Sequence, residues 1–208
     1  MMKKQLSALG IIGALMFSGV ASGTILSGQM TVDNAFNFYI TTNDSTIGIL
    51  VSSGNVWASA YSFSTSVTPG VTNYIHVVGN DYGVIAGFIG GFSLNDTSFH
   101  FANGTQNLLT NTTDWKVSTI GFGTGYVTPL NQGQNGVSPW GLNSGIPGSS
   151  AWIWEPNNCT NCTAYFSASI APALAVPEPE EYMMMLLGFG MVGYQIKRKQ
   201  KKSAPAAA

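Results

Sequence analysis

Two cysteines separated by two residues, Cys159 and Cys162, are the first side chains of this sequence that could do chemistry. In an oxidising compartment a single pair of cysteines most simply forms one disulfide, which here would close a very small loop. A redox centre needs a helix N-terminus to lower the thiol pKa, and nothing after Cys162 has a helical pattern. A zinc site needs four ligands, and His76 and His100 have no ligand spacing to the cysteines or to each other. We therefore predict a disulfide and no metal site.

Paired carboxylates are the second candidate, because hydrolysis of a glycosidic bond uses two of them on either side of that bond. Glu155 is the only Glu between Thr24 and Ala175, and most aspartates of this region lie in turn dipeptides, where such side chains cap the local backbone. No Gly-x-Ser-x-Gly or histidine-containing nucleophile motif is present. We therefore predict that the chain is not an enzyme. A hydrolase with a carboxylate pair such as Glu155 and Asp81 is the remote alternative.

Aromatic and amide side chains could instead bind a carbohydrate, since ligand sites combine flat aromatic surfaces with a few polar groups. Trp140 lies in a Gly/Pro-rich stretch and is the candidate platform, with Asn80 and Asp81 as candidate hydrogen-bonding partners. Trp152 and Trp154 should point to the same face of one strand, because side chains alternate along a strand. For that pair a place in the core is favoured over a ligand platform.

Oxygen-bearing turn residues are also candidate calcium ligands, because Ca²⁺ takes carboxylate and amide oxygens. The residues concerned are Asn43, Asp44, Asn80 and Asp81. Turn chemistry is the favoured interpretation of all four, so we predict no cofactor and leave a structural Ca²⁺ open.

The charge of the chain is very unevenly distributed. The formal net charge is −1, but seven of the eight Lys and Arg residues lie near the two ends. Between Thr24 and Ala175 there is one basic residue, Lys116, and there are six acidic residues, which gives this region a formal charge of −5. An acidic region repels phosphate backbones, so we predict that nucleic acid is not a partner.

The same region has the composition of an all-β domain, since it is poor in Glu and Lys and rich in β-branched and aromatic residues. Alternating or β-rich runs predict a series of strands separated by turn dipeptides such as Pro69-Gly70. The runs are 36–41, 57–63, 74–78, 84–92, 115–118, 151–154 and 164–170, and residues 119–150 are expected to form long ordered loops. Many short strands at this spacing predict a jelly-roll-like β-sandwich.

The last thirty-odd residues have three parts in a fixed order. Pro177, Glu178 and Pro179 are followed by an apolar run from Tyr182 to Ile196 and then by a basic cluster, which consists of Lys197, Arg198, Lys199, Lys201 and Lys202. Apolar residues partition into the bilayer, and basic residues are retained on its cytoplasmic side. This tail resembles the Pro-Glu-Pro C-terminal sorting signal (PEP-CTERM) of Gram-negative bacteria.

The resemblance implies recognition by a membrane-embedded exosortase, transient residence in the inner membrane, cleavage near the motif and delivery to the cell surface, in organisms that make exopolysaccharide. An ordinary C-terminal membrane anchor is the alternative. A fifteen-residue helix rises only ~22 Å, however, against ~30 Å of hydrocarbon. A permanent anchor is normally longer.

The N-terminal segment has the pattern of a secretory signal peptide. Lys3 and Lys4 precede an apolar segment, 6–20, and small residues follow at 21–23. Cleavage after Ala21 or Gly23 fits the pattern, and a first transmembrane helix is the alternative. We therefore divide the chain into a signal peptide (1–23), a β-sandwich domain (24–175), a sorting signal (176–202) and a disordered tail (203–208).

The middle domain also resembles the galactose-binding-like β-sandwich modules attached to rhamnosidases and related glycosidases. The resemblance lies in the order of short pieces along nearly the whole domain: 32–34, 38–40, Trp57, 69–73, 136–141, 151–154 and 163–166. Those modules usually carry a charged residue, often Arg, after the Tyr-Phe pair, and here Ser167 stands in that place. The resemblance implies a sugar-binding role for the domain.

Taken together, these patterns predict an exported, non-catalytic surface or matrix protein that associates with extracellular polysaccharide. A purely structural surface or adhesion protein without a ligand pocket is the alternative.

Overall fold

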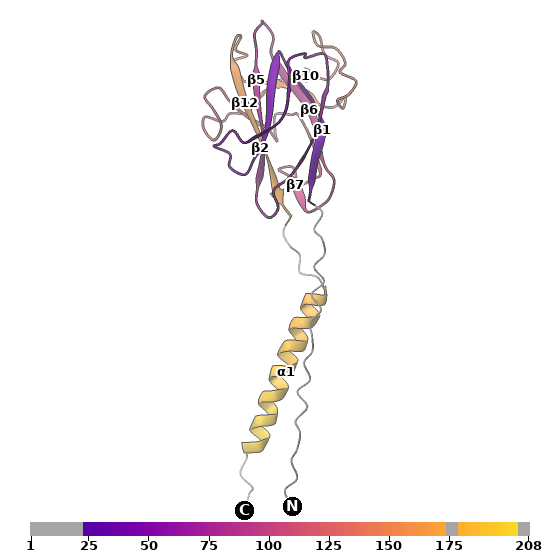
Figure 1. Cartoon of the computed structure of the whole chain (residues 1–208), viewed down its shortest axis with the longest axis vertical. Helices are drawn as coiled ribbons and strands as arrows, with labels where there is room; N and C mark the ends of the chain where they lie inside the picture. The colour runs from indigo at the N-terminus through magenta and orange to yellow at the C-terminus, as the bar shows by residue number, and fades with distance from the viewer. Residues whose placement is uncertain (1–22, 174–178, 204–208) are drawn as a thin grey trace, which may run out of the picture. The chain divides into compact units, whose positions relative to one another are not determined.

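The computed structural model describes residues 23–173 and 179–203 (Figure 1). The chain divides into two compact units, Met1–Ala171 and Pro172–Ala208. The described residues of the first unit, with the last residues of β12, form twelve strands: β1 (Ile25–Asp33), β2 (Ala35–Thr41), β3 (Ile49–Gly54), β4 (Tyr61–Ser66), β5 (Asn73–Asn80), β6 (Gly87–Leu94), β7 (Phe99–Phe101), β8 (Asn107–Leu109), β9 (Lys116–Ser118), β10 (Leu130–Gln134), β11 (Ala151–Trp154) and β12 (Thr163–Pro172).

The strands form two antiparallel sheets that pack face to face. Sheet A has the order β10-β11-β6-β1-β4, with β8 also paired to β6. Sheet B has the order β3-β2-β5-β12-β7, with β9 also paired to β12. Figure 1 shows β2, β5 and β12 in one layer and β1, β6 and β10 in the other. The predicted all-β class is thereby confirmed at the level of two stacked sheets.

The core between the sheets is aromatic. In β2 the side chains alternate, so that Phe36, Phe38 and Ile40 are buried in the core while the residues between them lie on the outer face. The Phe38 ring packs edge-on against Phe63 of sheet A at 4.7 Å between ring centroids. Its centroid lies 6.2 Å from that of Phe92. Edge-to-face contacts of this kind add to the free energy of burying the rings, and they join the two sheets.

The outer face of sheet A is partly covered by the segment 135–150. A second apolar cluster lies there, made of Ile89, Trp140, Ile146 and Trp152. Asn135 holds this segment in shape, because its side-chain amide donates to the backbone oxygens of Asn143 and Ile146 at 2.9 and 2.8 Å. The segment is thus an ordered cover on the sheet.

Two further loops, 42–48 and 119–127, lie on the outer face of sheet B. Phe122 stacks on His76 of β5 with 3.7 Å between ring centroids and an interplanar angle of 3°. Lys116 of β9 places its Nζ 5.5 Å from the centroid of the Tyr126 ring. His76 is fully buried although it lies on the outer side of its sheet, because these loops cover it.

Two predicted strand boundaries and one predicted loop are wrong. Residues 57–60 form a turn closed by the backbone bond from Ser59 N to Val56 O, and the strand begins only at Tyr61. Residues 84–86 precede β6, and Val84 is 80% exposed. The stretch 119–150 contains β10, which the sequence analysis assigned to loops. β10 lacks an apolar pattern and is a strand because it pairs with β11 at the sheet edge.

The second unit contains a helix, α1 (Pro179–Ser203). The apolar run from Tyr182 to Ile196 lies within this helix, and most of its side chains are exposed. The basic residues from Lys197 to Lys202 occupy the last turns of this helix. In the described parts of the chain, no helix has both the length and the apolar character required to cross a membrane. Pro179 begins α1, whereas Pro177, Glu178 and the predicted signal peptide up to residue 22 lie outside the described residues.

Candidate functional site

The cysteine pair forms a disulfide, Cys159–Cys162, in a loop held by two buried carboxylates. Glu155 accepts hydrogen bonds from the backbone N–H of Asn157, at 2.9 Å, and of Cys159. Asp81 accepts one from Asn161 N at 3.1 Å and another from the neighbouring Gly83 N at 2.9 Å. Both carboxylates therefore serve the loop backbone, which is the capping role that turn chemistry predicts.

Trp140 does not offer an open aromatic face. Only 7% of it is exposed, and its ring stacks on Trp152 with 4.5 Å between centroids and an interplanar angle of 15°. Its indole N–H donates to Asp33 Oδ2 at 2.9 Å. Burial raises the pKa of Asp33, the Trp140 hydrogen bond opposes this shift, and the nearby charge of Asp81 adds to it. Trp140 is thus a packing residue of the cover over sheet A.

Trp152 and Trp154 pack in different clusters, which corrects the expectation that they share one face. Trp152 belongs to the outer cluster with Trp140, whereas Trp154 packs in the central core, 5.5 Å from the Phe166 ring. Trp154 is the last residue of β11, and the period of two does not hold at this strand end.

Asp44 is the centre of a polar cluster on the outer side of sheet B. Its Oδ1 accepts hydrogen bonds from Ser167 Oγ at 2.6 Å and from Tyr126 OH at 2.9 Å, and lies 3.0 Å from His76 Nε2. A nucleophilic triad would need the serine hydroxyl on the imidazole. Here both groups contact the carboxylate instead, so the cluster fastens the loops 42–48 and 119–127 to β5 and β12.

The pKa values of this cluster shift for identifiable reasons. Burial lowers the pKa of His76, and the hydrogen bond and charge of Asp44 only partly oppose that shift. For Asp44, burial acts to raise the pKa, but the hydrogen bonds from Ser167, His76 and Tyr126 outweigh it and lower the pKa. The cluster therefore favours a neutral imidazole beside an ionised carboxylate.

Acidification should weaken the fold through His76. Because its folded pKa lies below the ordinary value of 6.5, the unfolded chain binds the proton first. The free energy of unfolding should thus fall as the pH drops below 6.5, by at most about 1.4 kcal/mol per pH unit. The contribution of Asp44 to the free energy of unfolding should be lost only below pH 3.8, as the pH falls through the lowered pKa of this carboxyl.

Urea midpoints measured between pH 8 and pH 4.5 test the effect of His76. His76→Gln should flatten this dependence and His100→Gln should retain it, so an unchanged slope in His76→Gln would contradict the assignment.

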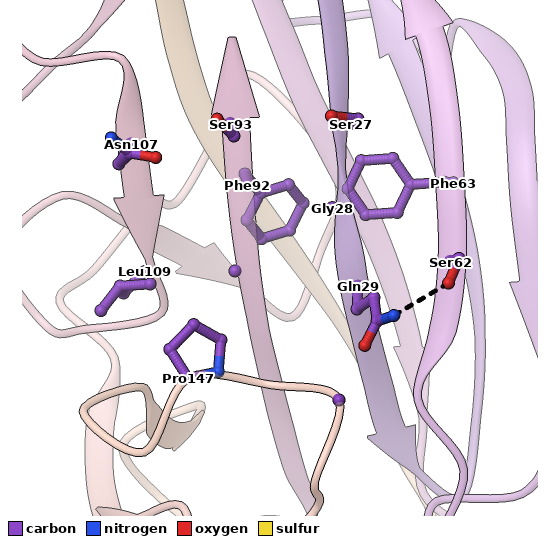
Figure 2. A pocket seen from close by; sticks show the side chains of 12 residues that line it. Ser27, Gly28, Gln29, Ser62, Phe63, Phe92, Ser93, Asn107, Leu109 and Pro147 are labelled. Carbon is purple, nitrogen blue, oxygen red and sulfur yellow. Dashed lines mark hydrogen bonds between the residues drawn. The ribbon is translucent and has the colours of Figure 1, made fainter. Parts of the chain in front are cut away.

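A groove of about 420 Å³ lies on the outer face of sheet A (Figure 2). Its lining comes from two rows of residues paired across β4, β1, β6 and β8, and register partners point to the same face of a sheet. One row is Ser27, Ser93 and Asn107, and the other is Ser62, Gln29, Gly91 and Leu109. Between the rows, Gly28 lies beside the core rings of Phe63 and Phe92.

The first row leaves polar groups free for a ligand. Within the part of the chain that the structure describes, the side chains of Ser27, Ser93 and Asn107 make no hydrogen bond to the protein. Gln29 is held differently, because its Nε2 donates to Ser62 Oγ at 3.0 Å (Figure 2). The groove thus presents two free hydroxyls and one free amide, and none of the described residues that line it is charged.

Glycines let the cover over sheet A close one side of this groove. A Cβ atom on Gly91 would lie 2.9 Å from Pro147 Cδ, so a larger residue would push the cover away from the sheet. Gly145 is similarly pressed against Gln29 and Ala60. The groove is therefore a product of the fold, with strands as its floor and the segment 145–147 as a wall.

Asn80, the remaining candidate from the sequence, lies at the end of β5. Its Oδ1 accepts a hydrogen bond from Thr163 Oγ1 at 2.9 Å, and its side chain lines a smaller pocket at the start of β2. The structure therefore does not bring Asn80 and Asp81 together with Trp140 in one open pocket. Among residues 23–173 and 179–203, no three His, Cys, Asp or Glu side chains gather in a way that could hold a metal ion.

Sequence reasoning missed the groove residues and the Asp44 cluster. The serines on β1, β4 and β6 alternate with core residues, and that alternation is a signal for an outward polar face. No protein-family model, curated protein or solved structure matches the chain in comparisons with known proteins.

Proposed function

We propose that this chain is an exported, non-catalytic protein of the cell surface or extracellular matrix, and that the groove on sheet A binds neutral polysaccharide. The observation that supports the binding role is the groove itself, which offers unpaired hydroxyl and amide groups and no charge. Hydroxyl and amide groups match the donors and acceptors of a sugar, and an uncharged lining selects against anionic or cationic ligands.

The proposed route of export rests on the two ends of the chain. The N-terminal pattern supports a cleaved signal peptide, and the Pro-Glu-Pro motif with its apolar and basic segments supports sorting by an exosortase. On this proposal the precursor resides briefly in the inner membrane of a Gram-negative bacterium, and the mature protein that reaches the surface is a jelly-roll-like sandwich.

Removing the free polar groups of the groove should weaken binding strongly without harming the fold. The triple variant Ser27→Ala/Ser93→Ala/Asn107→Ala removes three groups that bond nothing else in the described chain. At about 1 kcal/mol for each lost hydrogen bond, the dissociation constant should rise about 100-fold. Retention on a gel of the host's exopolysaccharide, with a titration of a soluble fragment, measures this change.

The matched control is Ser64→Ala, since Ser64 is an exposed serine paired with Ser27 that does not line the groove. It should bind as the unchanged protein does. Equal retention of the triple variant and the control would show that the groove is not the binding site. Elution of the unchanged protein without retention would refute polysaccharide binding.

A structural adhesion protein is the second candidate, and the edge strand β3 favours it. β3 ends sheet B, and its first residues Ile49 and Leu50 are 74% and 55% exposed. An unpaired edge with apolar side chains can pair with another chain. Melting curves with a glycan panel distinguish the two functions, because only a ligand that binds the folded state raises the melting temperature.

A further inference from the structure

The smaller pocket at the start of β2 has the same ligand chemistry as the groove but lies on different strands. Its volume is about 370 Å³, and its lining comes mainly from β2, the end of β3 and the end of β5. Asn37 and Ser53 are register partners, so their side chains lie next to each other on the outer face of sheet B. The two pockets share no lining residue.

The polar groups of this second pocket are also available to a ligand. Across the described residues, the side chains of Asn37, Ser53 and Asn55 form no hydrogen bond within the protein. The hydrogen bond from Thr163 occupies the Asn80 Oδ1 and thereby fixes the amide, which leaves its Nδ2 as a donor. None of the described residues that line this pocket carries a charge.

An exposed aromatic ring completes the pocket. Tyr82 lines it and is 67% exposed, while its backbone N–H is anchored by Asn34 Oδ1 at 2.7 Å. An anchored tyrosine presents an apolar ring face and a polar hydroxyl to the same ligand. This is the open aromatic surface that Trp140 does not provide.

The floor of the pocket depends on a glycine. A Cβ on Gly54 would lie 2.6 Å from ring atoms of both Phe36 and Tyr61, so only glycine lets these rings approach the strand. The Tyr61 hydroxyl is itself fixed, since it accepts hydrogen bonds from the backbone N–H of Asn55 and Val56 at 3.3 and 3.2 Å. The pocket is therefore preformed.

We infer that the second pocket is a further binding site for neutral glycans, so that one chain holds two polysaccharide strands and cross-links them. This inference rests on the proposed function, because both sites are assigned the same class of ligand. Because each protein molecule carries two sites, one polysaccharide can bind to several protein molecules, and each protein molecule can bind two polysaccharides. Multivalent binding of this kind is tighter than binding at a single site.

The stoichiometry of ligand binding tests the inference. The full chain is titrated with an oligosaccharide fragment of the host's exopolysaccharide, and light scattering of the intact polysaccharide is followed in parallel. The unchanged protein should bind two fragments per chain and increase the scattering. The variant Asn37→Ala/Asn55→Ala/Tyr82→Ala and the triple variant of the groove should each bind one fragment and leave the scattering at its baseline.

The control is Val84→Ala, an exposed residue near Tyr82 that does not line the pocket, and it should keep both sites. One fragment per unchanged chain, with loss of binding only in the groove variant, would overturn the second site and leave the proposed function intact. Two fragments retained by the Tyr82 triple variant would also overturn it. An absence of any binding by the unchanged protein would refute the proposed function together with the inference.

Discussion

Trp152→Ala should lower the free energy of unfolding by about 3–5 kcal/mol, the cost typical of removing a buried tryptophan. Trp152 is fully buried and forms the base on which Trp140 stacks. It also fills the space above Gly87, where a Cβ atom would lie 2.8 Å from the Trp152 ring. The change should therefore release the segment 135–150 as well as leave a cavity. Chemical denaturation measures the loss in the free energy of unfolding. Amide hydrogen exchange at Asn135 and Asn143 measures the release of the segment 135–150.

Trp152→Phe is the matched control for this prediction. The Trp152 Nε1 has no hydrogen-bond partner among the described residues, so phenylalanine removes an unsatisfied donor while it keeps an aromatic ring in place. We expect a loss of only about 1 kcal/mol. Equal losses in the alanine and phenylalanine variants would show that stacking on Trp140 does not hold the cover.

Asp44→Ala should cost about 2–4 kcal/mol, because one carboxylate oxygen holds three donors from distant parts of the chain. His76 and Ser167 are both buried and would lose this partner. The loop 119–127 would lose the hydrogen bond of Tyr126 and should exchange its amide protons faster. Urea denaturation, together with exchange rates in that loop, measures the effect.

Asp96→Ala serves as the control for the loss of an acidic side chain. Asp96 lies near the surface and, among the described residues, its carboxylate accepts hydrogen bonds from Thr24 and from the backbone of Ser98. Its removal should cost about 1 kcal/mol or less. If the two alanine variants were equally stable, the Asp44 cluster would not be what fastens the loops to sheet B.

The sequence predicted best those strands whose burial follows their own residue pattern. β2 alternates Phe36, Phe38 and Ile40 with polar neighbours, and β11 is a short apolar run, so both strands could be recognised from composition and period alone. β10 could not be recognised, since its sequence is polar and its strand conformation comes from pairing with β11. The segment 57–60 shows the opposite case, in which an alternating pattern gives way to a turn.

The candidate sites were harder to predict because they are assembled across large sequence separations. Asp44 lies 32, 82 and 123 residues from its three partners, and no local pattern links such positions. The groove depends on the register that sets Ser27 beside Ser93, which only the sheet pairing determines. The Gly/Pro-rich stretch around Trp140 suggests an open loop, but Asn135 and Trp152 hold that stretch as a packed cover over sheet A.

The near absence of basic residues from the sandwich limits the positions at which one class of proteases could cut it. Proteases with trypsin-like specificity cut after Lys or Arg, and between residues 24 and 173 Lys116 is the only such residue. Lys116 lies in β9, where it is paired with Ser167 of β12. A protease of this kind could reach the peptide bond after Lys116 only if β9 separated from β12. We therefore expect the folded domain to resist proteases of this class.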